Sequence, residues 1–345
     1  MPRVIGMDPG TVGLDVVGLD EGELTFETSL ATAEALAHPD RLVAALLERG
    51  RPDLIAGPSG YGLPLRRGAD LTERDLRLAL LAAPGEDGGI GGLGRLLRLL
   101  VETGVPLVFL PGVIHLRSVP RQRKLNRVDL GTADKVCVAA LAIHDQHRRL
   151  GIDYAATSFI LLELGGAFTA ALAVDGGRIV DGIGGTAGPM GWHSSGAWDG
   201  EVAFLAGSVS KRMLFQGGVE TLAAQDDYAI AREAYVEGAV KAALQLTASV
   251  RSPREIVLSG RHAADQAIAG KLEERLAHVA PAVRLAGFGR RAREGAHGAA
   301  LIADGLAGGG FAPLVKTMGL ETASGTVLDH LHVIPRDAAL RRLGL

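Results

Sequence analysis

The sequence contains a single cysteine, Cys137, in 345 residues. One thiol excludes an internal disulfide framework and favours a reducing compartment. Cys137 lies in the apolar stretch VCVAALAI (136–143), which is typical of a small buried side chain. Aromatic residues make up only 4% of the chain, whereas glycine occurs 48 times. We therefore expect a reduced protein with closely packed small residues and many tight turns.

The sequence also has little net charge and no long apolar run. The formal net charge is −3 and the isoelectric point is near 6.4, so the composition does not favour a nucleic-acid partner. No apolar run approaches the roughly 20 residues that cross a bilayer, and the first residues show no signal-peptide pattern. We expect a cytoplasmic protein without a membrane partner. The length predicts one large domain or two of medium size.

An internal repeat is the most informative feature that is present. The segment IGMDPGTVGLDVVGLDEGEL (5–24) aligns without a gap over ILLELGGAFTAALAVDGGRI (160–179), 155 residues later. The alignment places Asp8 on Glu163, Gly10 on Gly165, Asp20 on Asp175 and Gly22 on Gly177. Each copy predicts an apolar strand that ends in a carboxylate and a glycine turn, followed by a β-hairpin.

Apolar periodicity after each copy alternates between helix and strand. In the first half it predicts helices over 40–50, 72–82, 93–103 and 132–150, and strands over 53–57 and 106–110. In the second half it predicts helices over about 225–249, 261–278 and 295–307, and strands over 255–260 and 282–287. This alternation predicts an α/β fold of two domains, 1–150 and 151–345, with mixed sheets flanked by helices and a cleft between them.

The two acidic turns suit a nucleotide. Glycine turns let backbone amides approach phosphate oxygens, and a carboxylate at a strand end can hold hydrated Mg²⁺. Two such turns from opposite halves would hold a polyphosphate from both sides, with Asp8 and Glu163 sharing the metal. The alternative for each acid alone is a solvated carboxylate that caps a turn.

Three motifs resemble the acetate and sugar kinase, Hsp70 and actin superfamily. They are GMDPGT (6–11), LELGGAFTA (162–170) and IVLSGR (256–261). The resemblance implies two ribonuclease-H-like (actin-like ATPase) domains that bind ATP and Mg²⁺. It implies nucleotide-binding roles for Asp8, Gly10, Thr11, Glu163, Gly165, Gly166 and Gly260, with Asp8 and Glu163 also at the metal. The adenosine motif usually has two glycines, and Ser259 occupies the first of these positions.

A closer resemblance is to the acetate and butyrate kinase branch. It rests on ELGGAFTAALAVDGGRIVDGIGG (163–185), LGTADKVCVAALA (130–142) and GAALIADGLAGG (298–309). The whole chain also resembles a family of predicted butyrate kinases of about this length (DUF1464-like). The resemblance implies a phosphotransferase with a small-molecule acceptor, such as a short-chain carboxylate, and is compatible with a homodimer.

The segment RQRKLNRVDLGTADK (121–135) contains the candidate base. By resemblance to sugar kinases of the superfamily, Asp129 would deprotonate a hydroxyl acceptor, with Asp134 as the second candidate. Alternatively, both acids only stabilise the start of the helix that follows. The segment also contains four basic residues, Arg121, Arg123, Lys124 and Arg127. They would either hold an anionic substrate or form a solvated surface.

A carboxylate acceptor needs no base, because it is already ionised at neutral pH; it needs cations. The carboxylate-kinase branch has an arginine for this purpose, and Ser194 occupies the corresponding position here. Substrate contacts are therefore expected from Arg127, from His193 and from Tyr61 in the loop 57–68. Two alternatives stay open: a nucleotide-binding regulator without turnover, and an ATPase or carbamoyl-type transferase on the same scaffold.

Overall fold

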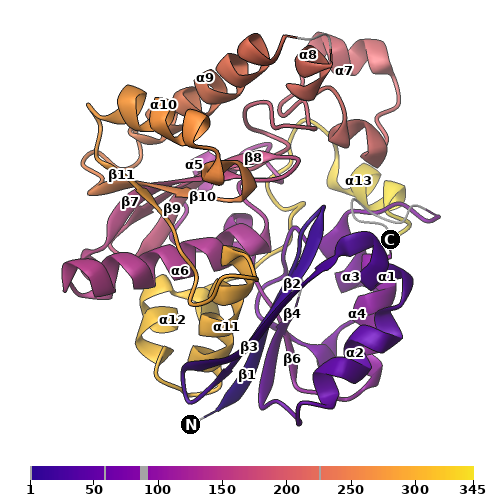
Figure 1. The fold of residues 1–345 in the computed structure, drawn as a ribbon. Coiled ribbons are helices and arrows are strands. Elements are labelled where there is room, and N and C mark those ends of the chain that lie inside the picture. Colours follow the sequence, from indigo (N-terminus) through magenta and orange to yellow (C-terminus); the bar gives the residue numbers. More distant parts are fainter. Residues whose placement is uncertain (1, 58–59, 86–91, 225–226) are drawn as a thin grey trace.

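Two mixed sheets form the framework of the computed structural model, which describes residues 2–57, 60–85, 92–224 and 227–345 (Figure 1). The first sheet has the strand order β3-β2-β1-β4-β6-β5, and the second has the order β11-β10-β7-β8-β9. The first contains β1 (Arg3–Pro9), β2 (Gly13–Asp20), β3 (Glu23–Ala31), β4 (Leu54–Gly57), β5 (Arg66–Arg67) and β6 (Leu107–Phe109). The second contains β7 (Ser158–Leu164), β8 (Thr169–Asp175), β9 (Arg178–Ile183), β10 (Glu255–Ser259) and β11 (Ala282–Arg284).

The strand register reproduces the sequence repeat. β1, β2 and β3 form an antiparallel meander, and β7, β8 and β9 form the same one. Asp8 is paired with Asp15, as Glu163 is paired with Ala170, at the offset of 155 residues. Each meander also has a register shift at the equivalent step, between 18 and 19 in the first and between 173 and 174 in the second. The two halves therefore share their backbone irregularities as well as their topology.

Helices of the first half cover the outer face of the first sheet. They are α1 (Thr32–Ala37), α2 (Pro39–Leu47), α3 (Glu73–Leu80) and α4 (Leu93–Glu102). Leu96, Leu97 and Leu100 of α4 are almost completely buried among apolar side chains of that face. The expected helices over 40–50, 72–82 and 93–103 are thus present, each ending slightly earlier than predicted.

Three helices lie between the sheets: α6 (Ala133–Leu150), α11 (Glu294–Leu306) and α12 (Ala312–Met318). α11 comes from the second half of the chain, yet it packs on β1, β2 and β4 of the first sheet. α6 comes from the first half and contacts β7 and β8 of the second sheet as well as α11 (Figure 1). One continuous apolar core joins both sheets through these helices.

The outer face of the second sheet is covered by α8 (Glu220–Ala223), α9 (Tyr228–Leu246) and α10 (Gln266–Leu276). The predicted continuous helix over 261–278 is wrong at its start. Arg261–Ala264 forms a 3₁₀ turn, and the Asp265 carboxylate accepts a hydrogen bond from the backbone N–H of Ala267, so that α10 begins at Gln266. Part of the predicted helix 225–249 lies outside the described residues.

The remaining helices are α5 (Arg121–Lys124), α7 (Gly200–Ala206) and α13 (Arg336–Arg342). Cys137 is buried, as its apolar surroundings predicted. Within the described ranges, no helix has both the length and the apolar character needed to cross a membrane.

Candidate functional site

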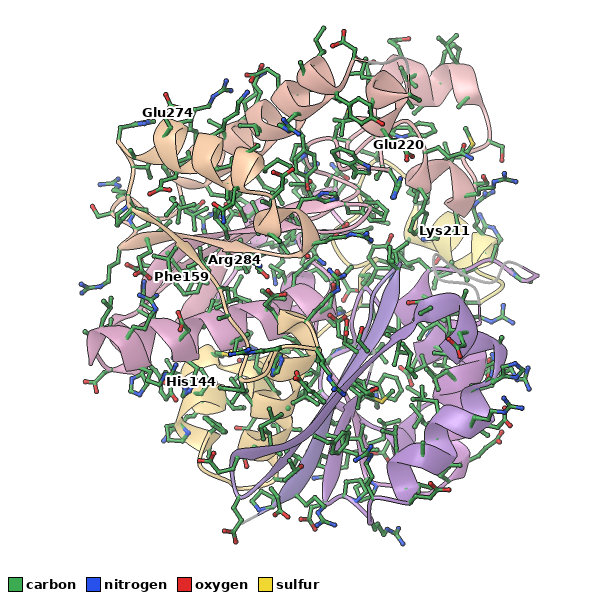
Figure 2. The ribbon with its side chains drawn as sticks, viewed as in Figure 1. His144, Phe159, Lys211, Glu220, Glu274 and Arg284 are labelled. Atoms are coloured by element: carbon green, nitrogen blue, oxygen red, sulfur yellow. The ribbon has the colours of Figure 1, made fainter. Side chains whose placement is uncertain are left out.

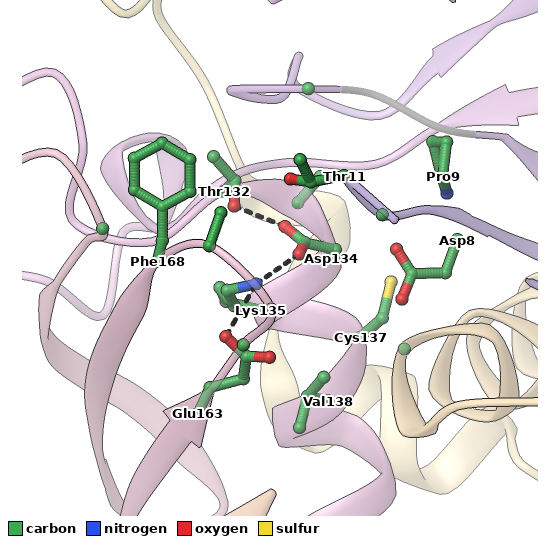
Figure 3. A pocket seen from close by; sticks show the side chains of 18 of the residues that line it. Asp8, Pro9, Thr11, Thr132, Asp134, Lys135, Cys137, Val138, Glu163 and Phe168 are labelled. Carbon is green, nitrogen blue, oxygen red and sulfur yellow. Dashed lines mark hydrogen bonds and ion pairs between the residues drawn. The ribbon is translucent and has the colours of Figure 1, made fainter. Parts of the chain in front are cut away.

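The two acids of the repeat face the space between the sheets. Along β1, Val4 points toward the inner helices and Ile5 toward the outer ones, so the alternation turns Asp8 inward. Along β7, Phe159 and Leu161 point inward, which turns Glu163 inward as well. Both carboxylates line one cleft, although 155 positions separate them in the sequence (Figure 3).

The glycine turns that follow these acids lie side by side. The N–H of Gly10 donates a 2.9 Å hydrogen bond to the carbonyl of Gly13, which closes the first turn. A Cβ atom at Gly166, in the second turn, would be 3.2 Å from a methyl carbon of Val12 in the first. The cleft also contains most other predicted positions, namely Thr11, Gly165, Gly260, Tyr61, Asp129 and Asp134.

Lys135, which the sequence analysis did not single out, lies at the centre of the charged cluster. Its ammonium nitrogen is 2.5 Å from Oδ2 of Asp134 and 3.0 Å from Oε2 of Glu163 (Figure 3). Burial alone would lower the pKa of Lys135, but the charges of Asp134 and Glu163 outweigh it and raise that pKa well above its usual value. A lysine in the first turn of a helix opposes the helix dipole, and this anomaly was the available signal in the sequence.

Asp8 is the least compensated acid of the cluster. Its pKa is raised well above the usual value, chiefly by burial and next by the charge of Asp134. Its Oδ1 atom is buried and has no hydrogen-bond partner among the described residues. Burial also raises the pKa of Glu163, against the attraction of Lys135. For Asp134 the charge of Lys135 outweighs burial, and the pKa is lowered.

The donor set fits a hydrated Mg²⁺ ion better than a fully protein-coordinated metal. Among the described residues no group of three or more His, Cys, Asp or Glu side chains could hold a metal ion. Mg²⁺ keeps several waters and is bound through one or two carboxylates, and the unpartnered Oδ1 atom of Asp8 offers such a ligand. Asp8 and Glu163 therefore suit an ion that enters together with phosphates.

Asp129 is held by hydrogen bonds on both of its carboxylate oxygens. Oδ1 accepts from the N–H of Gly131 at 3.1 Å. Oδ2 accepts from the N–H and the hydroxyl of Thr186, at 3.0 and 2.8 Å. Asp129 thus joins the start of α6 to the segment that follows β9. Asp134, the second candidate base, accepts from the Thr132 hydroxyl and from Lys135.

Two residues expected at the substrate lie outside the cleft lining. Arg127 is exposed, and His193 forms a 2.5 Å contact with the Glu220 carboxylate. Ser194, at the position of the expected arginine, is buried, and its hydroxyl oxygen accepts from the N–H of Gly196 at 3.1 Å. Tyr61 alone among the predicted substrate residues lines the cleft; its neighbours Pro58 and Ser59 lie outside the described residues.

Two of the four basic residues near Asp129, Arg123 and Lys124, bind backbone carbonyls of the scaffold, and the other two, Arg121 and Arg127, are exposed. Arg123 donates to the carbonyl of Val180 at 2.7 Å, and the ammonium of Lys124 donates to the carbonyl of Leu116 at the same distance. The lysines and arginines that do line the cleft, within the part of the chain that the structure describes, are Lys135, Lys211, Arg261 and Arg293. The cations that line the cleft therefore come from distant segments and not from the basic run before Asp129.

The family model described as "Protein of unknown function (DUF1464)" matches residues 6–333, nearly the whole chain. The chain belongs to the DUF1464 family. No curated protein matches this DUF1464 protein.

Solved structures with the same fold include carboxylate kinases. The DUF1464 protein is similar to an acetate kinase from Entamoeba histolytica, with a TM-score of 0.58 and 10% identity over 80% of this chain and 86% of that one. It is similar to the Porphyromonas gingivalis acetate kinase, with a TM-score of 0.57 and 13% identity over 87% and 98% of the chains. It is also similar to a propionate kinase from Francisella tularensis, with a TM-score of 0.58 and 13% identity over 87% of this chain and 98% of that one. These values establish the two-domain fold.

Proposed function

We propose that this DUF1464 protein is an ATP- and Mg²⁺-dependent phosphotransferase that acts on a small molecule, with a short-chain carboxylate such as butyrate as the acceptor. One observation carries the proposal: the glycine turns of both repeats, each preceded by a carboxylate, meet in a single cleft. Two such turns present backbone N–H groups to a polyphosphate from both sides.

Different residues of the cleft would contact the phosphates, supply positive charge and hold the metal ion. The turns at Gly10 and Gly165 would contact phosphate oxygens, and the hydroxyl of Thr11 lies beside the first turn. Lys135 supplies a fixed positive charge between the two halves. Asp8 and Glu163 would hold a hydrated Mg²⁺ ion, which offsets phosphate charge when it is bound.

The hydrogen bonds of Asp129 favour a carboxylate acceptor over a hydroxyl acceptor. A hydroxyl must lose its proton, and Asp129 has little capacity left to accept it, because Oδ2 already accepts two hydrogen bonds from the protein and Oδ1 accepts one. A carboxylate oxygen needs no base. It forms the new bond to the γ-phosphorus while the bond from that phosphorus to the ADP oxygen breaks. The products are an acyl phosphate and ADP, and no proton is transferred.

Titration calorimetry with Mg²⁺-ATP tests the nucleotide site. We expect binding by the wild type and at least about tenfold weaker binding by Asp8→Asn and Glu163→Gln, because each removes a charged ligand. Asp175→Asn is the matched control, since this acid ends the strand after Glu163 and is exposed away from the cleft. Failure of the wild type to bind millimolar Mg²⁺-ATP, or equal losses in all three variants, would contradict the proposal.

Turnover is tested separately by trapping acyl phosphate with hydroxylamine after incubation with Mg²⁺-ATP and butyrate. A nucleotide-binding regulator is the second candidate, favoured by the buried position of Ser194, which leaves the expected arginine without a substitute at that position. Nucleotide binding with neither hydroxamate from any short-chain carboxylate nor ATP hydrolysis would select the regulator.

A further inference from the structure

Two consecutive helices of the second half bury none of their residues. They are α7 and the 3₁₀ helix Lys211–Phe215. Around them, the N–H groups of Gly207 and Met213 donate to carbonyls only three residues earlier in the chain. A segment with so few buried apolar contacts has low local stability, so its position depends on the tertiary contacts that it makes.

The 3₁₀ helix nevertheless forms a wall of the cleft. Leu214 and Phe215 both line the cleft. The Phe215 ring meets the ring of Phe168 edge to face, with the ring centres 4.8 Å apart, and Phe168 lines the cleft as well. An apolar wall of the cleft is therefore carried by a helix that is itself poorly buried.

The first half contributes residues to the same end of the cleft. Leu80, the last residue of α3, and Tyr61 both line it. The N–H of Tyr61 donates to the carbonyl of Ala79 at 2.8 Å, which fixes Tyr61 beside the end of α3. The ammonium nitrogen of Lys211 is 4.8 Å from the centre of the Tyr61 ring, so the 3₁₀ helix contacts this part of the first half. Apolar side chains from both halves thus enclose a space that suits the apolar chain of an acceptor.

The chain end that follows α13 is fixed on the first half. Leu343 is buried in the central core. Nη1 of Arg77, in α3, donates to the carbonyl of Leu343 at 2.7 Å. A Cβ atom at Gly344 would lie 2.6 Å from Cγ of Pro84, so the backbone packs closely against the loop after α3. α13 is therefore held beside the helix that ends in Leu80.

The other contact of α13 is with the second half. Nη2 of Arg342, the last residue of α13, donates to the carbonyl of Val209 at 3.4 Å, just before the 3₁₀ helix. Figure 2 shows Lys211, which begins the 3₁₀ helix, next to the yellow helix α13. Because the 3₁₀ helix buries none of its residues, a bond at its start restricts where Leu214 and Phe215 lie. α13 thus connects α3 to the wall of the cleft.

We propose that α13 limits the length of the acceptor's apolar chain by holding the wall formed by Leu214 and Phe215 in place. This inference rests on the proposed phosphotransferase function and adds to it what selects the size of the acceptor. A longer apolar chain needs more room, which it gains only if the wall moves outward and the bond from Arg342 to Val209 breaks. Arg342 and Arg77 are therefore positioning residues.

Calorimetric titration of the full-length protein with butyrate and with octanoate tests this limit. We expect Arg342→Ala to raise the affinity for octanoate relative to butyrate about two- to tenfold, the usual effect of losing one hydrogen bond. Arg342→Lys retains a donor and should keep the ratio close to that of the wild type. Arg341→Ala is the matched control, because Arg341 is the exposed neighbour of Arg342 in α13. Mg²⁺-ATP affinity should be unchanged in all three variants.

Hydrogen exchange of the amides of residues 207–215 gives a second readout that needs no acceptor. Arg342→Ala and Arg77→Met should each speed exchange in this segment about two- to tenfold, because each removes one end of the connection. Arg341→Ala and Arg74→Met should exchange as the wild type does, since Arg74 is exposed and lies one turn before Arg77 in α3.

The outcomes separate this proposal from the phosphotransferase function. An unchanged ratio of octanoate to butyrate affinity in Arg342→Ala, or unchanged exchange of residues 207–215, would overturn the role of α13 and leave the nucleotide site and turnover intact. A wild type that binds neither carboxylate would overturn the size limit together with the carboxylate acceptor. A shifted ratio and faster exchange in Arg342→Ala, but no hydroxamate from the wild type with Mg²⁺-ATP, would support the role of α13 and overturn the phosphotransferase.

Discussion

The acidic side chains of the cleft pack directly against glycines. A Cβ atom at Gly295 would lie 2.0 Å from Oδ2 of Asp8, and one at Gly260 would lie 2.8 Å from Oε1 of Glu163. A Cβ atom at Gly165 would lie 3.1 Å from Oε2 of Glu163. The carboxylates occupy their positions only because the opposing residues have no side chain, so these glycines shape the site as much as the acids do.

Gly260→Ala should damage both stability and nucleotide binding. Gly260 has φ of +88°, and an alanine Cβ there would also lie 2.7 Å from the Leu164 carbonyl. We expect a loss of about 1–3 kcal/mol in the free energy of unfolding and weaker Mg²⁺-ATP binding. Gly270→Ala is the control, because Gly270 lies in α10 with open space around it. That variant should gain up to about 1 kcal/mol from helix propensity. Equal stability of the two variants in urea denaturation would contradict the expectation.

His115 makes stability depend on pH. Burial lowers its pKa to about 4, against a hydrogen bond to Gly112. In the unfolded chain its pKa is about 6.5, so the unfolded state binds more protons between these values. The folded protein should therefore lose up to about 3 kcal/mol of stability through His115 as pH falls from 6.5 to 4.

The measurement is the free energy of unfolding at pH 7.5 and at pH 5 for wild type, His115→Asn and His278→Asn. The pH-dependent loss should shrink in His115→Asn and persist in His278→Asn, since His278 is exposed. If the free energy of unfolding fell equally with pH in all three proteins, a group other than His115 would be responsible.

At the residue scale, the repeat was the signal that worked. Aligning the two copies predicted that Asp8 and Glu163 belong together, and the structure places both in one cleft. Lys135 and Lys211 were missed for different reasons. Lys135 is adjacent to Asp134 in the sequence and was not considered separately, whereas Lys211 lies on a 3₁₀ helix, Lys211–Phe215, whose position against the cleft depends on long-range packing.

At the element scale, the start of α6 positions much of the site. Thr132 occupies the N-cap position, but its hydroxyl donates to Asp134 and makes no capping bond. α6 presents Asp134 and Lys135 to the cleft from its first turn, while Ala139 and Ile143 are buried in the central core. The charged end and the apolar body of one helix thus couple the site to the core.

Asp129→Asn tests whether the residue before α6 is structural or a base. Both carboxylate oxygens accept hydrogen bonds, whereas an amide has only one acceptor oxygen, so the bonds from either Gly131 or Thr186 are lost and we expect a loss of about 1–3 kcal/mol in stability. Mg²⁺-ATP affinity and the pH dependence of kcat with butyrate should stay close to those of the wild type. A fully stable Asn variant that binds Mg²⁺-ATP but has lost turnover would instead identify Asp129 as the base.

Element boundaries followed from periodicity where helices are long and amphipathic, as in α4 and α6. The predicted helix over 261–278 was wrong only at its start, because a local carboxylate cap at Asp265 competes with continuation of the preceding turn. Such competition depends on backbone geometry around Gly260, which hydrophobic periodicity does not report.

At the scale of the whole molecule, two central helices pack on the sheet of the opposite half: α11 on the first sheet and α6 on the second. α11 fits between the first sheet and α6 because two glycines permit close approach. A Cβ at Gly6 would lie 2.2 Å from the Ala300 nitrogen, and one at Gly298 would lie 1.8 Å from the Cys137 carbonyl. The sequence contained these glycines and the helix, but nothing in a local pattern specified which sheet α11 would cover.

A fragment of residues 1–150 should not fold on its own, because α11 would be missing from its sheet and would leave apolar residues such as Val4 and Val17 exposed. The full chain should unfold in one transition, since a single core joins both halves. Circular dichroism and urea denaturation of fragment and full chain would check both points. A cooperative transition in the fragment would refute this expectation.

Because α11 belongs to the second half but covers the first sheet, its packing also has a consequence during translation. The first sheet is complete in sequence by residue 109, yet the helix that covers its inner face begins at Glu294. At typical rates of synthesis, that face stays open for on the order of ten seconds after its strands have left the ribosome. During this interval the nascent chain presents an uncovered apolar surface, which is the kind of surface that chaperones bind. Helices α6 and α11 thus give the finished protein one core, and they also make its synthesis depend on protection until residues 294–306 appear.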